Sequence, residues 1–158
     1  MRFPGALLAV AAIAVAVTGC SDDSSKSGVA QTKVGDCINI TDNAPNATKG
    51  EPIDCASPKA VYKVFQTFDK DTPCASGYTR YSAQPGSGFM CLAPNFKQDS
   101  CYNEVGSAPY KWAECGTKEA TIKVVKRVDG SADEFECSGS ANFITVADPK
   151  TVFCLGKP

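Results

Sequence analysis

The chain has 158 residues, of which 16 are basic and 17 acidic, and it contains no histidine. A net charge of −1 is too balanced to suggest nucleic-acid binding, which relies on clustered Lys and Arg. The missing histidine removes the commonest general base and the commonest metal ligand. We therefore expect no nucleic-acid partner, no cofactor and no catalytic group built on histidine.

The N-terminal residues have the features of a bacterial lipoprotein signal peptide. Arg2 precedes an uncharged run over residues 6–17, which is shorter than the roughly 20 apolar residues that cross a bilayer. Thr18 and Gly19 then place small residues directly before Cys20, as lipidation requires. We expect removal of residues 1–19 and a diacylglyceryl anchor on Cys20, which holds the chain on the extracytoplasmic face of a bacterial cell membrane.

Residues 20–33 separate this anchor from the rest of the chain. After Cys20 they are small or polar, with one branched aliphatic residue and no aromatic. Such a segment cannot bury enough apolar surface to offset the entropy lost on ordering. We predict a flexible tether between the membrane and the folded part.

The eight cysteines beyond the tether indicate an internal repeat. The sequence around Cys37, with an isoleucine and an asparagine after it, aligns with that around Cys101, and Cys55 aligns with Cys115. Cys74 to Cys91 and Cys137 to Cys154 enclose equal lengths of chain. We predict two tandem repeats, residues 34–96 and 97–158, packed against each other.

Hydrophobic alternation predicts the strands of each repeat. The best candidate covers residues 61–68, where Tyr62, Val64 and Phe68 share one face, and Ile122, Val124 and Val128 take the equivalent places. Gln66 and Lys126 interrupt these faces, which indicates that the strands run out toward solvent there. Shorter extended segments are expected at residues 37–41, 52–56, 88–93 and 151–155.

A short helix is expected between the third and last strands of each repeat. Thr72 and Pro73 suit the N-cap and first helical position, and Cys74, Tyr78 and Tyr81 share one helical face. Cys137, Ala141 and Ile144 have the same spacing in the second repeat. These helices give an α+β fold class, with two tandem disulfide-stapled repeats.

The cysteine spacing favours disulfides over zinc. Structural zinc sites use close cysteine pairs, whereas these cysteines are widely spaced and an exported chain is oxidised, so we expect no metal. Pairing within each repeat leaves alternative connectivities. We predict bonds between sequence neighbours: Cys37–Cys55, Cys74–Cys91, Cys101–Cys115 and Cys137–Cys154.

The segment Val34-Gly35-Asp36-Cys37, followed by Ile53-Asp54-Cys55 and the strand after it, resembles small actinobacterial cell-envelope lipoproteins of the LppU type. The resemblance covers residues 34–91 best. It implies an envelope location and a disulfide-bonded α+β module. Related modules often carry a histidine between the second cysteine and the strand, where this chain has Lys59 and, in the second repeat, Glu119.

The function most consistent with this sequence is non-catalytic binding in the cell envelope. The chain has no recognisable catalytic motif, and Tyr110 and Trp112 are the best candidates for contact with an envelope protein, a peptide or a glycan. The alternative for Trp112 is that it covers the seam between the repeats. A second hypothesis is a carboxylate-dependent envelope hydrolase, with candidate acids Asp69, Asp71, Asp133, Glu134 and Glu136 in polar turns that suit solvated acids.

Overall fold

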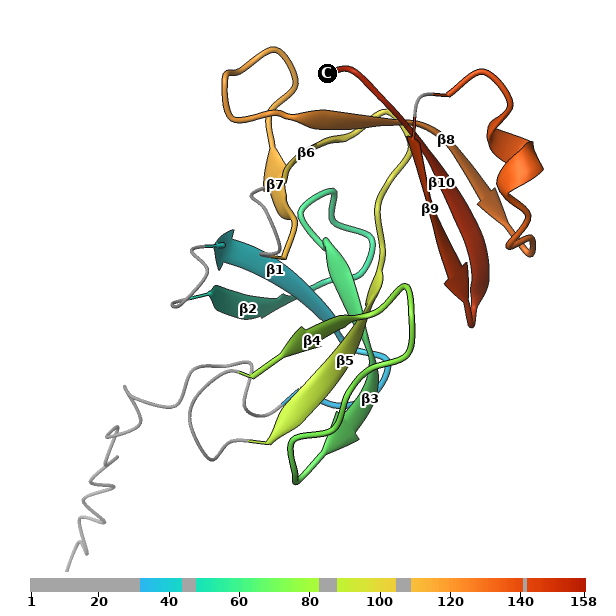
Figure 1. The fold of residues 1–158 in the computed structure, drawn as a ribbon. Coiled ribbons are helices and arrows are strands. Elements are labelled where there is room, and N and C mark those ends of the chain that lie inside the picture. The colour runs from blue at the N-terminus through green and yellow to red at the C-terminus, as the bar shows by residue number, and fades with distance from the viewer. Residues whose placement is uncertain (1–31, 44–47, 83–87, 105–108, 141) are drawn as a thin grey trace, which may run out of the picture.

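The computed structural model describes residues 32–43, 48–82, 88–104, 109–140 and 142–158. They form two five-stranded antiparallel sheets, one above the other in Figure 1. Cys20 and the signal segment lie outside the described residues, as does Ala141. In the part of the chain that is described, no helix is long and apolar enough to cross a membrane.

The two sheets have the same strand order. The first contains β1 (Cys37–Asp42), β2 (Lys49–Ile53), β3 (Tyr62–Phe68), β4 (Thr79–Tyr81) and β5 (Phe89–Pro94), in the order β2-β1-β3-β5-β4. The second contains β6 (Cys101–Asn103), β7 (Lys111–Ala113), β8 (Ile122–Asp129), β9 (Asn142–Ala147) and β10 (Lys150–Gly156), in the order β7-β6-β8-β10-β9. The strand predicted at 52–56 lies earlier in the chain, as β2, because residues 54–60 form turns.

The long strand of each sheet carries a β-bulge at the same place. The pairing of β3 with β5 shifts between Val64 and Gln66, and the pairing of β8 with β10 shifts between Cys154 and Leu155, opposite Val124 and Lys126. A bulge changes which face the following residues occupy. Gln66 and Lys126 therefore mark bulges, and the strands continue beyond them.

This change of face corrects the predicted alternation. Val124 belongs to the large core, whereas Val128 packs in a separate cluster with Cys137, Val152 and Cys154. Phe68 pairs with Phe89, which lies two residues before Cys91 on the same strand and therefore on the same face. Phe68 thus shares the disulfide face of its sheet and not the face of Tyr62.

The predicted helices were wrong: edge strands lie in their places. β4 begins at Thr79, and β9 takes the run Asn142–Ala147 with its β-branched residues, while the residues before them form turns and one 3-10 turn, η2 (Glu134–Cys137). Gly77 and Gly139 adopt left-handed conformations, with φ of 86° and 94°, that end a helix. The fold is therefore mostly β. Among the described residues the only helical element is η2, which is too little helix for the predicted α+β class.

Four disulfides join the cysteines as sequence neighbours. Their Cα separations are 5.1 Å for Cys37–Cys55, 5.6 Å for Cys74–Cys91, 5.2 Å for Cys101–Cys115 and 5.2 Å for Cys137–Cys154. In each sheet one bond ties the first strand to the turn after the second strand. The other ties the last strand to the segment before the edge strand. The disulfides therefore hold the segments next to both edge strands of each sheet.

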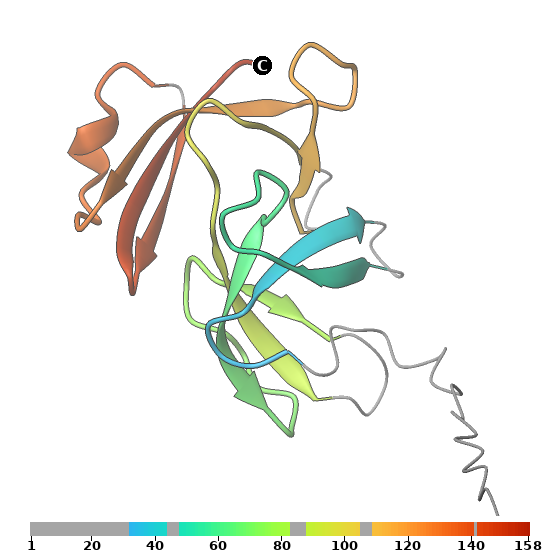
Figure 2. The same ribbon diagram turned by 180° about the vertical axis from the view of Figure 1, so that it is seen from behind.

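One core crosses the seam between the sheets. Phe96 lies in the segment that connects β5 to β6, visible from behind in Figure 2, and it is fully buried. Its ring centroid is 4.4 to 6.2 Å from the rings of four aromatic residues, Tyr62 of the first sheet and Tyr102, Tyr110 and Phe153 of the second. Aromatic pairs at this distance pack tightly. The sheets therefore share a core.

A second contact joins the sheets at β9. The Tyr78 hydroxyl donates to the carbonyl oxygen of Asp148 at 2.7 Å and accepts from its N–H at 3.1 Å. Gly77 lies so close to β9 that a Cβ there would be 2.6 Å from the Thr145 carbonyl oxygen. This close approach requires glycine.

Candidate binding groove between the two sheets

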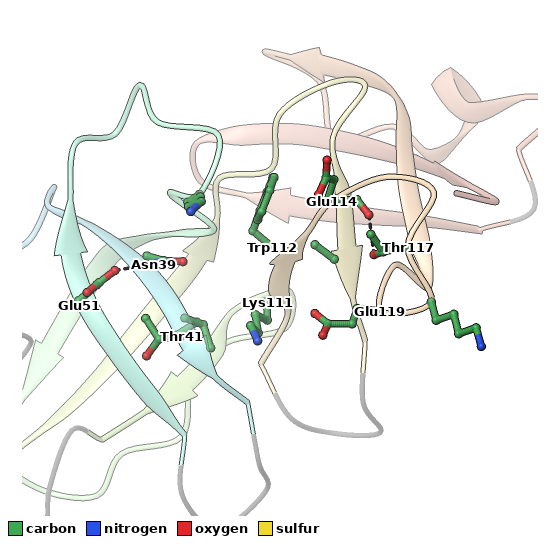
Figure 3. Close-up of a pocket in the computed structure, with 12 residues that line it drawn as sticks. Asn39, Thr41, Glu51, Lys111, Trp112, Glu114, Thr117 and Glu119 are labelled. Atoms are coloured by element: carbon green, nitrogen blue, oxygen red, sulfur yellow. Dashed lines mark hydrogen bonds between the residues drawn. The ribbon is translucent and has the colours of Figure 1, made fainter.

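A groove of about 770 Å³ lies at the seam, with one wall from each sheet (Figure 3). The first sheet contributes 39–41 of β1, Glu51 of β2 and Lys59 of the turn before β3. The second contributes β7, Glu114 and residues 117–119 of the following turn. The two walls are equivalent in part: β2 corresponds to β7 and the two turns correspond to each other, whereas β6, the counterpart of β1, does not line the groove.

The turns beside the groove form in the same way in both sheets. Ser57 N–H donates to the Asp54 carbonyl at 3.0 Å and Ala60 N–H to the Ser57 carbonyl at 3.1 Å. In the second sheet Thr117 N–H donates to the Glu114 carbonyl at 3.2 Å and Ala120 N–H to the Thr117 carbonyl at 3.3 Å. The common backbone geometry gives Lys59 and Glu119 equivalent places.

The strand pairing identifies a second equivalent pair. Asn39 lies opposite Glu51 in the first sheet, and Asn103 lies opposite Lys111 in the second. Glu51 therefore corresponds to Lys111, as Lys59 corresponds to Glu119. At both positions the two walls of the groove carry opposite charges.

The charges of the groove are balanced and not paired with one another. Three glutamates and three lysines line it: Glu51, Glu114, Glu119, Lys59, Lys111 and Lys118. The ion pairs found among the described residues lie elsewhere, between Arg80 and Asp71, Lys126 and Glu136, and Arg127 and Asp129. The groove charges are therefore available to a ligand of mixed charge.

Asn39 is the most buried polar residue of the groove, at 8% exposure. Its amide nitrogen donates to a Glu51 carboxylate oxygen at 2.8 Å, as the dashed line in Figure 3 marks. This hydrogen bond holds the Glu51 carboxylate on the wall of the groove.

Trp112 lines the groove and also packs, partly buried, against the common core. The ammonium group of Lys59 lies 5.2 Å from the centroid of its ring, a cation–π distance that links the two walls. Trp112 therefore covers the seam and faces the groove at once.

Tyr110 is not among the groove residues and is held by polar contacts of its own. Its hydroxyl donates to a Glu104 carboxylate oxygen at 2.7 Å, and its backbone N–H donates to the Tyr62 hydroxyl at 2.9 Å. Burial, followed by the hydrogen bond with Glu104, raises the pKa of Tyr110 well above its usual range. The structure therefore separates the two predicted contact residues and gives Tyr110 a place in the seam.

The acids suggested for hydrolysis do not meet in the groove. Asp71 pairs with Arg80 at 2.5 Å, Glu136 pairs with Lys126 at 3.3 Å, and the Asp133 carboxylate accepts from the Phe135 N–H at 3.0 Å at the start of η2. Asp69 borders a separate small pocket beside Thr32 and Met90. Within the described ranges, no group of three histidine, cysteine or acidic residues is arranged to hold a metal ion.

Sequence reasoning identified Trp112 but missed the charged residues around it. Aligning the two repeats residue by residue would have matched Glu51 with Lys111. Both follow the strand of the first cysteine and precede the second cysteine at a similar distance. That the two positions line one groove depends on how the sheets pack.

Comparisons with family models, with curated proteins and with solved structures find no match for this chain.

Proposed function

We propose that this chain is a lipid-anchored, extracytoplasmic module of the bacterial cell envelope that binds a partner in the groove without catalysis. The observation that carries the proposal is the groove itself, in which Trp112 is surrounded by six charged side chains that form no ion pairs with one another. Interfaces favour tryptophan, and charge complementarity adds specificity.

The location is part of the same proposal. The Cys20 signal, the polar tether and the resemblance to LppU-type lipoproteins support an anchor outside the cytoplasm. The four disulfides are compatible with that compartment, because disulfides persist where the environment is oxidising.

A carboxylate-dependent hydrolase is the second candidate. Glu51 from one wall and Glu114 and Glu119 from the other line the same groove, and paired acids are the groups that such chemistry uses. Binding is favoured because the Glu51 carboxylate accepts from the Asn39 amide, and no hydrogen bond among the described residues joins it to Glu114 or Glu119 on the other wall.

The test is capture of envelope partners with the lipidated protein from detergent-solubilised membranes. Lys111→Glu, which repeats the charge found at Glu51, is compared with Lys150→Glu, whose lysine begins β10 and does not line the groove. We expect Lys111→Glu to reduce recovery of the partner at least tenfold and Lys150→Glu to leave recovery unchanged. Equal recovery with both variants would remove the groove as the binding surface.

A further inference from the structure

The main chain of β7 has a free edge beside the groove. β7 is the outermost strand of its sheet and pairs only with β6, where Trp112 lies opposite Tyr102. The Tyr102 carbonyl accepts from Thr121 N–H at 2.9 Å, so its backbone groups point toward β8 and away from β7. In an antiparallel pair of this kind the opposite residue also points its N–H and C=O outward. Trp112 therefore presents both groups at the free edge.

No protein group satisfies this edge in the part of the chain that the structure describes. Tyr110, two residues earlier, donates its N–H to Tyr62, but Trp112 makes no backbone hydrogen bond beyond its own sheet. The equivalent residue of the first sheet is Pro52, which lies opposite Ile38 and has no N–H to donate. The second sheet thus carries a donor and an acceptor where the first has only an acceptor.

The side chains around this edge suit a peptide better than other polymers. Three glutamates oppose a nucleic acid or another polyanion, and a neutral glycan has no charges for the six ionic groups. An extended peptide with acidic and basic side chains matches both the opposite charges of the two walls and the unpaired main-chain groups of Trp112.

We propose that the groove binds an extended peptide segment of mixed charge, whose main chain pairs with Trp112 at the free edge of β7. The peptide donates to the Trp112 carbonyl and accepts from its N–H, while its side chains meet Lys111 and Glu51 on opposite walls. This inference rests on the proposed function and specifies the class of partner.

The test uses a defined probe and a backbone-matched pair of variants. The probe is a capped octapeptide in which lysine and glutamate alternate with valine, and its control carries the same side chains with alternate backbone nitrogens methylated. On the protein, Trp112→Pro removes the N–H at a position where the first sheet already accommodates proline, and Trp112→Val removes only the indole. Non-reducing mass spectrometry and circular dichroism verify that each variant keeps four disulfides and its sheets.

Calorimetry and amide NMR shifts provide the readout. We expect the octapeptide to bind with a dissociation constant of about 1 mM or tighter, the methylated peptide at least tenfold more weakly, and Trp112→Pro at least tenfold more weakly than Trp112→Val. No binding of the octapeptide, equal binding of the methylated peptide, or equal affinity of the two variants would overturn the inference. So would binding of a chito-oligosaccharide probe in place of the peptide. In each of these cases a loss of envelope partner with Lys111→Glu would still uphold the groove as the binding surface.

Discussion

Gly35 and Asp99 occupy equivalent places ahead of the two sheets, and both have a positive φ. Gly35 has a φ of 99° and Asp99 a φ of 64°, and each N–H donates at 2.8 Å to the carbonyl of the equivalent valine, Val64 or Val124. A left-handed conformation costs a residue with a side chain about 1 kcal/mol relative to glycine. The second sheet therefore bears a strain that glycine avoids in the first.

Exchanging these residues tests that reading. Gly35→Asp is expected to lower the free energy of unfolding by about 1 kcal/mol, since a Cβ at Gly35 meets no atom within 4 Å and only the backbone term changes. Asp99→Gly is expected to raise it or leave it unchanged. Denaturant unfolding of both variants measures the two effects, and a stabilised Gly35→Asp would contradict the reading.

Ionisation of Tyr62 makes the free energy of unfolding depend on pH in the alkaline range. Burial raises its pKa to about 12, from about 10 in an unfolded chain. Its stabilisation is complete below pH 10 and is lost as the pH rises toward 12, by about 1.4 kcal/mol per pH unit. Between pH 9 and pH 11 we expect the unfolding free energy of the wild type to fall by about 1.4 kcal/mol more than that of Tyr62→Phe. An equal fall in both proteins would show that Tyr62 ionises normally when folded.

At the scale of elements, the cysteine frame was more informative than local periodicity. The four disulfides join sequence neighbours because each sheet brings a strand beside the turn or segment that follows within about one hairpin length. Helical spacing from Cys137 to Ile144 was misleading because the aromatic Phe143 and the β-branched run Ile144-Thr145-Val146 favour a strand. The bulges in β3 and β8 were signalled by Gln66 and Lys126, but the break in alternation was interpreted as the end of each strand because a bulge and a strand end interrupt the pattern alike.

Removing the first disulfide of either sheet tests how much that bond contributes to stability. Replacing Cys37 and Cys55 together with alanine, or Cys101 and Cys115 together, opens loops with sequence separations of 18 and 14 residues. Each double variant is expected to lose about 3 kcal/mol of unfolding free energy by the chain-entropy model. Calorimetry or denaturant unfolding measures the loss, and a double variant as stable as the wild type would show that the sheet pairing alone fixes these strands.

For the whole molecule, the seam decides whether the sheets act as one body. Phe96 packs against aromatic residues of both sheets, and the close approach of Gly77 to Thr145 adds a second point of contact. The groove depends on this packing, since each of its walls belongs to a different sheet. Its residues could therefore be proposed singly from the sequence, as Trp112 was, but their assembly depends on contacts that no local pattern encodes.

Gly77→Ala tests the second contact, with Gly116→Ala as the control. Both glycines have positive φ, 86° and 84°, but a Cβ at Gly77 would meet the Thr145 carbonyl, whereas one at Gly116 meets no atom within 4 Å. The control therefore shows the backbone strain alone. We expect Gly77→Ala to lose at least about 1 kcal/mol more unfolding free energy than Gly116→Ala. Equal losses would mean that the sheets are not in close contact there.

Phe96→Ala tests the aromatic seam. Loss of a fully buried phenylalanine is expected to cost about 4 kcal/mol, whereas Phe135→Ala, at a residue 79% exposed, is expected to change stability little. Because Phe96 joins the two sheets, its removal is also expected to broaden or split the thermal transition. A single sharp transition at the wild-type temperature would contradict the role of Phe96.

We propose that the chain is exported, lipidated and then held by its four disulfides. The most direct test is the intact mass of the protein purified from membranes without reductant. We predict an N-terminus at Cys20 that carries a diacylglyceryl group, and a polypeptide mass lower by eight hydrogens than the fully reduced form. An unprocessed N-terminus without lipid, or eight free thiols, would contradict it.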